Sequence, residues 1–398
     1  MIVGAVGAMW GVLTLSLTGP LWFRALGVGI TLASAVSVAV DIRKTRREDS
    51  RLYVYEDRGA AALACRVSDI YQDWQDRQWR SRPHRYLTDP VLNSLLDSAV
   101  IPLELDGRFS LDPSVASLQG FLLLHEWRKG SVLLDHPKLR LAEDLTRSRL
   151  QQGTPLRLEH TSYFEGTCTN ESADKEVRLQ ATDGVRFRGV SLCSDSRVLL
   201  DLAQSRCSNH IGVSTLAITS DGYLVTTVQA RHSAKFPNQV APSGSGSVDR
   251  ADLPGHETLR GLVVHAMERE LLEECGIRPV SGACRTALIG YARIVERGGK
   301  PEFFGFTRLA ACRSEIRVAR NEVVYVADAR GHRVNRRDLI PDLKRLRREG
   351  EASFTPIMHV ALELLVDAIM RGDPAVVDLL GSDRATSHEP PPGMATRA

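Results

Sequence analysis

The sequence predicts an α/β sandwich in its C-terminal half, preceded by a mixed α/β linker region and an N-terminal helical hairpin. Three observations support this fold class. Residues 156–372 alternate β-branched, strand-like stretches with two helical stretches, which is typical of helices packed on a sheet. Residues 50–155 mix both patterns, and residues 2–40 carry one formal charge, Arg24. A chain of 398 residues is long enough for about two or three folding units.

The first segment, residues 1–42, predicts a transmembrane hairpin. Thr18-Gly19-Pro20 interrupts the apolar run and leaves pieces of residues 1–18 and 21–40. Each piece would reach about 27–30 Å as a helix, which is close to the hydrocarbon thickness of a bilayer. One tilted or re-entrant span is the alternative. The basic residues at 43–47 predict, by the positive-inside tendency, a membrane-anchored protein with the bulk of the chain in the cytoplasm and the lipid bilayer as a partner.

A cleaved signal peptide is the other interpretation of this segment, because Ala33-Ser34-Ala35 resembles a cleavage site. The absence of a positive n-region and the basic residues that follow so closely argue against it. The seven cysteines are odd in number and form no CxxC pair. They therefore indicate a reducing compartment and disfavour a disulfide framework or a zinc site.

Composition narrows the function classes. Hydrophobic residues make up 43% of the chain and charged residues 25%, which is typical of a globular protein. The net charge of +3 is small, so we expect no nucleic-acid partner. The sequence does not indicate an oligomeric state.

Residues 50–155 form a mixed or helical region of unknown role. Val67 to Arg80 predicts an amphipathic helix, because its apolar residues recur at spacings of three and four. Val91 to Val100 is apolar at helical spacing, and Gly120 to Leu134 is strongly apolar. We interpret the region as a link between the membrane segment and the C-terminal sandwich. A nucleic-acid surface and an interaction scaffold are the alternatives.

Residues 156–372 predict the elements of the sandwich. Val213–Arg231 and Ala283–Ala310 predict two hairpins, the second turning at Gly298-Gly299, and Asn321–Ala329 predicts one more strand. Helices are predicted at about Thr258–Cys275 and at Ser353–Met370. The last stretch, residues 382–398, is rich in proline and polar residues and predicts a disordered tail.

The first of these helices concentrates acidic residues on one face. Glu270, Glu273 and Glu274 are spaced i, i+3, i+4, so their carboxylates converge. Converging carboxylates repel one another unless a cation lies among them, and Mg²⁺ prefers oxygen ligands. Arg269 can lie beside them and fix their rotamers, while Gly276 suits the left-handed residue that ends a helix. A solvated acidic face is the alternative.

The string Arg-Glu-Leu-Leu-Glu-Glu-Cys-Gly-Ile, residues 269–277, resembles the second half of the Nudix box, REUxEExGU with U apolar. The chain is similar to the Nudix hydrolases over about residues 211–340. This resemblance implies a Nudix α/β/α sandwich within residues 156–372.

The first half of the box fits less well. Strict counting places Gly255 at the motif glycine but Gly261 where the family has glutamate. A second alignment gives Gly246, in "PSGSGSVD", the role of the glycine and makes the following loop longer than usual. Glu257 would then stand in for the missing glutamate. We favour the second alignment.

The resemblance also implies an activity and a site. Nudix enzymes use Mg²⁺ or Mn²⁺ and water to cleave a diphosphate bond in nucleoside diphosphate derivatives. Here it would make Glu270, Glu273 and Glu274 the metal ligands and catalytic residues, together with Arg269. Arg231 and a backbone carbonyl near Gly246 would bind substrate or metal. The later glutamate of the family would be Glu302, Glu315 or Glu322, and Glu302 is also an expected substrate contact.

We therefore expect a membrane-anchored pyrophosphohydrolase, an enzyme acting on acid anhydrides. No marker in the sequence selects the substrate. The alternative is a Nudix-fold module that senses a nucleotide without hydrolysing it, which the altered first half-box leaves open.

Overall fold

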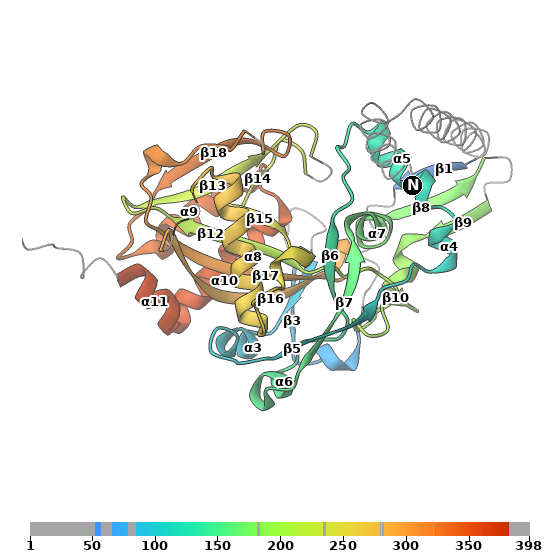
Figure 1. The fold of residues 1–398 in the computed structure, drawn as a ribbon, viewed down its shortest axis with the longest axis horizontal. Coiled ribbons are helices and arrows are strands. Elements are labelled where there is room, and N and C mark those ends of the chain that lie inside the picture. The colour runs from blue at the N-terminus through green and yellow to red at the C-terminus, as the bar shows by residue number, and fades with distance from the viewer. Residues whose placement is uncertain are drawn as a thin grey trace, which may run out of the picture.

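The computed structural model describes residues 52–56, 66–78, 85–180, 184–233, 236–278, 280, 282–320 and 322–381 of the chain. These residues form a mixed α/β structure of two lobes (Figure 1). One lobe is built on a nine-stranded sheet, and three smaller sheets of three strands lie in the other.

The large sheet is mixed in direction. Its strands are β3 (Gln75–Gln78), β4 (Arg85–Thr88), β12 (Gly212–Ile218), β13 (Tyr223–Gln229), β14 (Val240–Ala241), β15 (Gly244–Ser247), β16 (Cys284–Ile294), β17 (Lys300–Leu309) and β18 (Val326–Arg333). The main order is β14-β13-β12-β17-β16-β4-β3, with β15 paired to β12 and β18 paired to β13. The pair β12–β17 is parallel and the other pairs are antiparallel. Both predicted hairpins are confirmed, including the turn at Gly298-Gly299.

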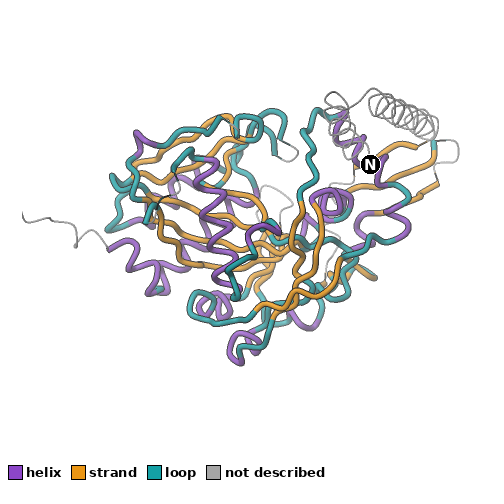
Figure 2. Tube along the Cα trace, in the orientation of Figure 1, coloured by secondary structure: helices purple, strands orange, loops and turns teal. Residues whose placement is uncertain are grey.

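Helices cover both faces of this sheet (Figure 2). Helix α8 (Leu259–Glu274) packs on the face that presents Val213 and Phe303. Helices α9 (Leu339–Gly350), α10 (Pro356–Arg371) and α11 (Pro374–Gly381) pack on the face that presents Leu216 and Phe304. Side chains alternate along a strand, so the two apolar sets of β12 and β17 serve two separate cores. The layer order is therefore α/β/α.

The second lobe precedes most of the large sheet in the chain. Its strands are β1 (Leu52–Glu56), β2 (Arg66–Val67), β5 (Leu103–Arg108), β6 (Pro137–Leu141), β7 (Leu156–Ser162), β8 (Lys175–Leu179), β9 (Gly184–Arg188), β10 (Ser194–Asp195) and β11 (Val198–Leu199). Its helices are α3 (Pro90–Leu95), α4 (Pro113–Ala116), α5 (Gln119–Arg128), α6 (Arg147–Gln152) and α7 (Tyr163–Cys168), with short 3-10 turns at 69–71, 170–172 and 189–192. Leu139 and Leu158 share a core with Leu262 of α8, so the lobes are packed together.

Two sequence predictions of local structure are corrected, and one helix was missed. The predicted helix Val67–Arg80 is a 3-10 turn at Asp69–Tyr71 followed by β3, because Trp74 packs edge-on against Tyr71 at 5.0 Å and against Tyr291 at 5.8 Å between ring centroids. The strand predicted from Asn321 begins at Val326. Helix α9 was not predicted.

The predicted membrane localisation is also corrected. Among the described residues no helix is long and apolar enough to cross a bilayer. Helices α8 and α10 have 16 residues each, about 24 Å, which is shorter than the hydrocarbon core. The predicted hairpin, residues 1–42, and the predicted tail, residues 382–398, lie outside the described residues.

Candidate metal centre

Helix α8 carries the predicted carboxylates, and its ends are set by local sequence. The Thr258 hydroxyl accepts a hydrogen bond from the Gly261 backbone N–H and caps the first turn. Gly276 adopts φ +62° after the last turn, where a Cβ would lie 2.5 Å from the Arg317 carbonyl oxygen. Met267 and Leu271 are buried against the sheet. The predicted helix is therefore confirmed.

The helix glutamates (Glu270, Glu273 and Glu274) differ in exposure. The Glu270 side chain is 16% exposed, Glu273 is 45% exposed, and the residue Glu274 is 5% exposed. Strand β15 runs close beside them, and a Cβ added to Gly246 would lie 2.1 Å from the Glu270 carboxylate. Gly246 therefore leaves the space that Glu270 occupies, so the structure brings together the two halves of the second alignment.

Arg269 holds this group in place. Its guanidinium donates two hydrogen bonds to Asp252, at 2.7 and 3.0 Å, and one to Glu273 at 3.1 Å. It lies 3.1 Å from Glu270 and donates to the Ser247 carbonyl at 3.2 Å. The guanidinium group is planar and carries five N–H donors, so one arginine can bind several acceptors at once. Arg269 thus ties α8 to β15 and to the turn that contains Asp252.

Asp252 was missed by the sequence reasoning. Glu257, the expected stand-in for the missing motif glutamate, is exposed just before the helix begins. Asp252 instead is 2% exposed and makes the paired contact with Arg269. The sequence signal that could have identified Asp252 is its spacing from Asp249. The two residues form a reciprocal capping box in a single 3-10 turn.

The electrostatics of the helix glutamates favour a bound cation. Burial raises the pKa of Glu270, with Arg269 and then Lys138 opposing the shift. Burial, Glu270 and Glu322 together raise the pKa of Glu274 well above its ordinary value. Arg269 and Lys138 oppose the shift at Glu270, whereas no cation is among the causes of the shift at Glu274.

Glu274 offers the clearest test of whether a metal fits. One carboxylate oxygen accepts a hydrogen bond from the Ser245 backbone N–H, whereas Oε2 is buried and has no hydrogen-bond partner among the described residues. An orphaned buried carboxylate oxygen costs free energy unless a cation binds it. Carboxylate oxygens are also the ligands that Mg²⁺ and Mn²⁺ prefer. The residues therefore fit a hard divalent cation.

The three later glutamates lie in different places. Burial is the main cause that raises the pKa of Glu322, and Glu273 on the helix is the second cause, so Glu322 lies near the helix. Glu315 is exposed and accepts a hydrogen bond from the Cys312 backbone N–H. Glu302 pairs in register with Gly212 on β12. Of the three, the structure brings Glu322 to the helix glutamates.

Glu302 lies on the opposite face of the sheet from α8. It accepts a hydrogen bond from Ser214 at 3.1 Å, and Ser214 alternates along β12 with Val213, which faces α8. Its other carboxylate oxygen accepts from Lys300 at 3.3 Å. Glu302 is therefore kept apart from the helix glutamates by the strands themselves. Arg231 is exposed just after β13, and no contact joins it to either group among the described residues.

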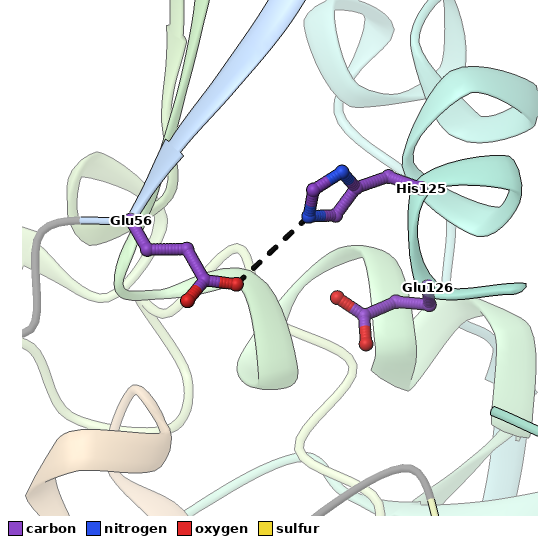
Figure 3. Close-up of side chains that lie close together, drawn as sticks. All are labelled: Glu56, His125 and Glu126. Carbon is purple, nitrogen blue, oxygen red and sulfur yellow. Dashed lines mark ion pairs between the residues drawn. The ribbon is translucent and has the colours of Figure 1, made fainter. Parts of the chain in front are cut away.

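A second cluster, Glu56, His125 and Glu126, has ligand atoms that all lie within 4.8 Å of one another (Figure 3). The His125 Nε2 is 3.8 Å from Glu56. However, Lys129 lies 2.6 Å from Glu56 and Lys175 lies 2.8 Å from Glu126. Two ammonium groups already neutralise the two carboxylates, so this cluster is an ion-pair network, unlike the surroundings of Glu274.

Comparisons with known proteins give limited information. No family model and no curated protein matches the chain. Chains of solved structures do match. DR0079 from Deinococcus radiodurans has 15% sequence identity and a TM-score of 0.24, covering 37% of this chain and 83% of its own. Tm1382, named as a candidate Nudix hydrolase, has 13% identity and a TM-score of 0.26, covering 40% of this chain and 70% of its own. These partial likenesses establish no family.

Proposed function

We propose that the chain is a divalent-metal-dependent hydrolase of the Nudix type that cleaves a diphosphate bond in a nucleoside diphosphate derivative. The observation that carries the proposal is the buried, unpartnered Oε2 of Glu274 beside Glu270 and Gly246. A binding module with no metal chemistry would leave this oxygen uncompensated.

Each residue near the helix has a distinct part in the proposed reaction. Glu270, Glu273 and Glu274 would hold Mg²⁺ or Mn²⁺, which when bound neutralises the diphosphate and lowers the pKa of an attacking water. Arg269 fixes the rotamers of Glu270 and Glu273 through its direct contacts. Glu322 would accept the proton of the attacking water, because it lies near Glu273 and its pKa is raised above the ordinary value by burial and then by Glu273.

The test is hydrolysis of a panel of nucleoside diphosphate derivatives with Mg²⁺ titrated in. We expect Glu274→Gln to lower kcat by at least about 100-fold, because several kcal/mol of transition-state stabilisation depend on the metal. Glu322→Gln should lower kcat by about 100-fold with little change in Mg²⁺ affinity, as expected for a general base. Glu268→Gln is the matched control, since Glu268 lies on the same helix but interacts with Thr286 and Cys284.

Two results would contradict the proposal. One is turnover that is unchanged in Glu274→Gln. The other is no turnover of any compound together with tight binding that does not need metal, which would favour the nucleotide-sensing alternative. Equal losses in Glu302→Gln, Glu315→Gln and Glu322→Gln would remove the basis for choosing Glu322.

A further inference from the structure

Cys193 and Cys207 lie against each other in the second lobe, although they form no CxxC motif in the chain. Cys193 directly follows the 3-10 turn at 189–192, and Cys207 lies in the loop that leads to β12. The Arg206 backbone N–H donates a hydrogen bond to the Leu192 carbonyl at 2.8 Å, so the residues beside the two cysteines are in contact. A hydrogen bond also joins the two thiols. We call Cys193 and Cys207 the thiol pair.

Both members of the thiol pair are free cysteines in the core of this lobe. Cys193 is 2% exposed and Cys207 is 0% exposed. A single buried cysteine behaves as a small apolar residue, and the buried Cys168 and Cys275 fit that description. Two thiols in contact have a further chemistry, because oxidation can join them.

The two thiols differ in acidity. The hydrogen bond from Cys207 lowers the pKa of Cys193, and the Arg293 guanidinium adds to this effect, although burial opposes both. The same hydrogen bond and then burial raise the pKa of Cys207 well above its ordinary value. For comparison, burial raises the pKa of Cys168 to about 12. The thiolate is the reactive form of cysteine, so Cys193 is the nucleophile of the thiol pair.

The surroundings of Cys193 fix the cation that favours its thiolate. Arg293 of β16 is fully buried and donates hydrogen bonds to Asp144 at 3.0 Å and to the Leu200 carbonyl at 3.4 Å. A Cβ added to Gly298, in the turn between β16 and β17, would lie 3.5 Å from the Cys193 sulfur. The thiol pair therefore lies where the large sheet meets the second lobe.

We propose that the thiol pair is a site of oxidation at which hydrogen peroxide joins Cys193 and Cys207 through a disulfide bond. The Cys193 thiolate attacks one peroxide oxygen, the O–O bond breaks, and hydroxide leaves and takes up the proton that Cys193 released. The product is a sulfenic acid on Cys193. The Cys207 sulfur then attacks the Cys193 sulfur, and the hydroxyl group leaves as water with the Cys207 proton. Two thiols are thus oxidised while one peroxide is reduced to two waters.

Peroxide suits this site because the sulfurs are too buried for a bulky disulfide oxidant. The new bond would close the loop of residues 193–207, which packs on residues of β6 and the turn after it. Arg140 donates hydrogen bonds to the Leu202 and Ser205 carbonyls, both at 3.2 Å, and the Leu202 N–H donates to Asp144 at 2.6 Å. Oxidation would therefore fasten this loop. The inference goes beyond the proposed function and does not depend on it.

The test treats the reduced full-length protein with hydrogen peroxide at concentrations that leave its circular dichroism unchanged. The remaining thiols are then blocked with iodoacetamide in denaturant, and the peptides are mapped by mass spectrometry. We expect a disulfide that links Cys193 to Cys207, formed while Cys168 and Cys275 are still thiols. Full alkylation of both Cys193 and Cys207, or a bond from Cys193 to another cysteine, would overturn the proposal.

Single variants separate the roles of the two thiols. In Cys207→Ser the sulfenic acid on Cys193 has no thiol to condense with, so peroxide followed by dimedone should label Cys193. Cys193→Ser should be labelled at Cys207 at least about tenfold less, because a buried thiol is a poor nucleophile. Cys168→Ser is the matched control from the same core and should still form the disulfide. Equal labelling of Cys207→Ser and Cys193→Ser would overturn the assignment of Cys193 as the nucleophile.

Urea denaturation measures the effect of the bond on the loop. Closing a loop of about 15 residues should lower the equilibrium constant for unfolding by about 100-fold relative to the reduced protein. Peroxide should cause no such change in Cys193→Ser, which controls for oxidation elsewhere in the chain. Equal constants for the oxidised and reduced protein, with the disulfide present, would overturn the proposed fastening of the loop.

Discussion

Glu274 and Glu302 are both buried carboxylates close to the same strands, yet they are compensated in opposite ways. Glu302 has Lys300 at 3.3 Å, Ser214 at 3.1 Å and Arg297 at 3.8 Å. Glu274 has one backbone hydrogen bond and an Oε2 with no partner among the described residues. A buried carboxylate with its own cations is complete, whereas one without them needs a cation from solution. The difference favours α8 over the opposite face of the sheet as the metal-binding side.

The largest expected effect on stability comes from removing a cation that compensates Glu302. Lys300→Met leaves Glu302 buried with a weaker partner, so we expect a loss of about 3–5 kcal/mol in the free energy of unfolding. Glu274→Gln removes a charge that the fold does not compensate, so metal-free stability should stay the same or rise. Urea denaturation without metal measures both, and a comparable loss in the two variants would show that the two sites are compensated alike.

A smaller difference in stability should distinguish alanine substitutions at Gly244 and Gly246, the two glycines that face α8. A Cβ at Gly244 would lie 2.6 Å from the Leu271 backbone, which cannot move alone, so Gly244→Ala should cost about 2 kcal/mol. The three atoms nearest to a Cβ at Gly246 would all belong to the carboxylate end of Glu270, which can rotate away. Gly246→Ala should therefore cost less stability but weaken Mg²⁺ binding, as thermal unfolding with and without Mg²⁺ would show. Unchanged Mg²⁺ affinity in Gly246→Ala would exclude Glu270 as a ligand.

The smallest effect is a dependence on pH. Folding raises the pKa of Glu274 above its ordinary value of 4.5, so the folded protein retains a proton that the unfolded chain releases. Metal-free stability should therefore fall as the pH rises from 4.5 through the raised pKa, by at most about 1.4 kcal/mol per pH unit for one proton. Mg²⁺ binds the ionised form, so its affinity should rise over the same interval.

Glu274→Gln is the control for that prediction. Its unfolding free energy should depend less on pH, and Mg²⁺ should stabilise it less at high pH. Chemical denaturation at a series of pH values measures this dependence. If the unfolding free energy of Glu274→Gln depends on pH as that of the unchanged protein does, the proton is not on this carboxyl.

Local patterns predicted the parts of the molecule that depend on neighbours in the chain. The helix predicted at about Thr258–Cys275 is α8, and Gly298-Gly299 predicted the turn between β16 and β17. A local pattern also misled the assignment of residues 67–80, which form a 3-10 turn followed by a strand. Of the apolar residues at helical spacing, Tyr71 is buried in the turn, whereas Ile70 is 40% exposed. The spacing of apolar residues shows which side chains can be buried. The backbone conformation of the segment depends on the residues that pack against those side chains.

The choice among distant residues came only from the tertiary structure. Sequence placed Glu302, Glu315 and Glu322 on equal terms, because nothing local tells which face of a sheet a glutamate occupies. The pairing of β12 with β17 turns Glu302 away from α8, and the loop after β17 returns Glu322 to it. Asp252, 17 residues before Arg269, became its partner by the same long-range folding. A sequence by itself determines helix periodicity and capping, because these depend on residues a few positions apart, whereas strand pairing decides which charges meet.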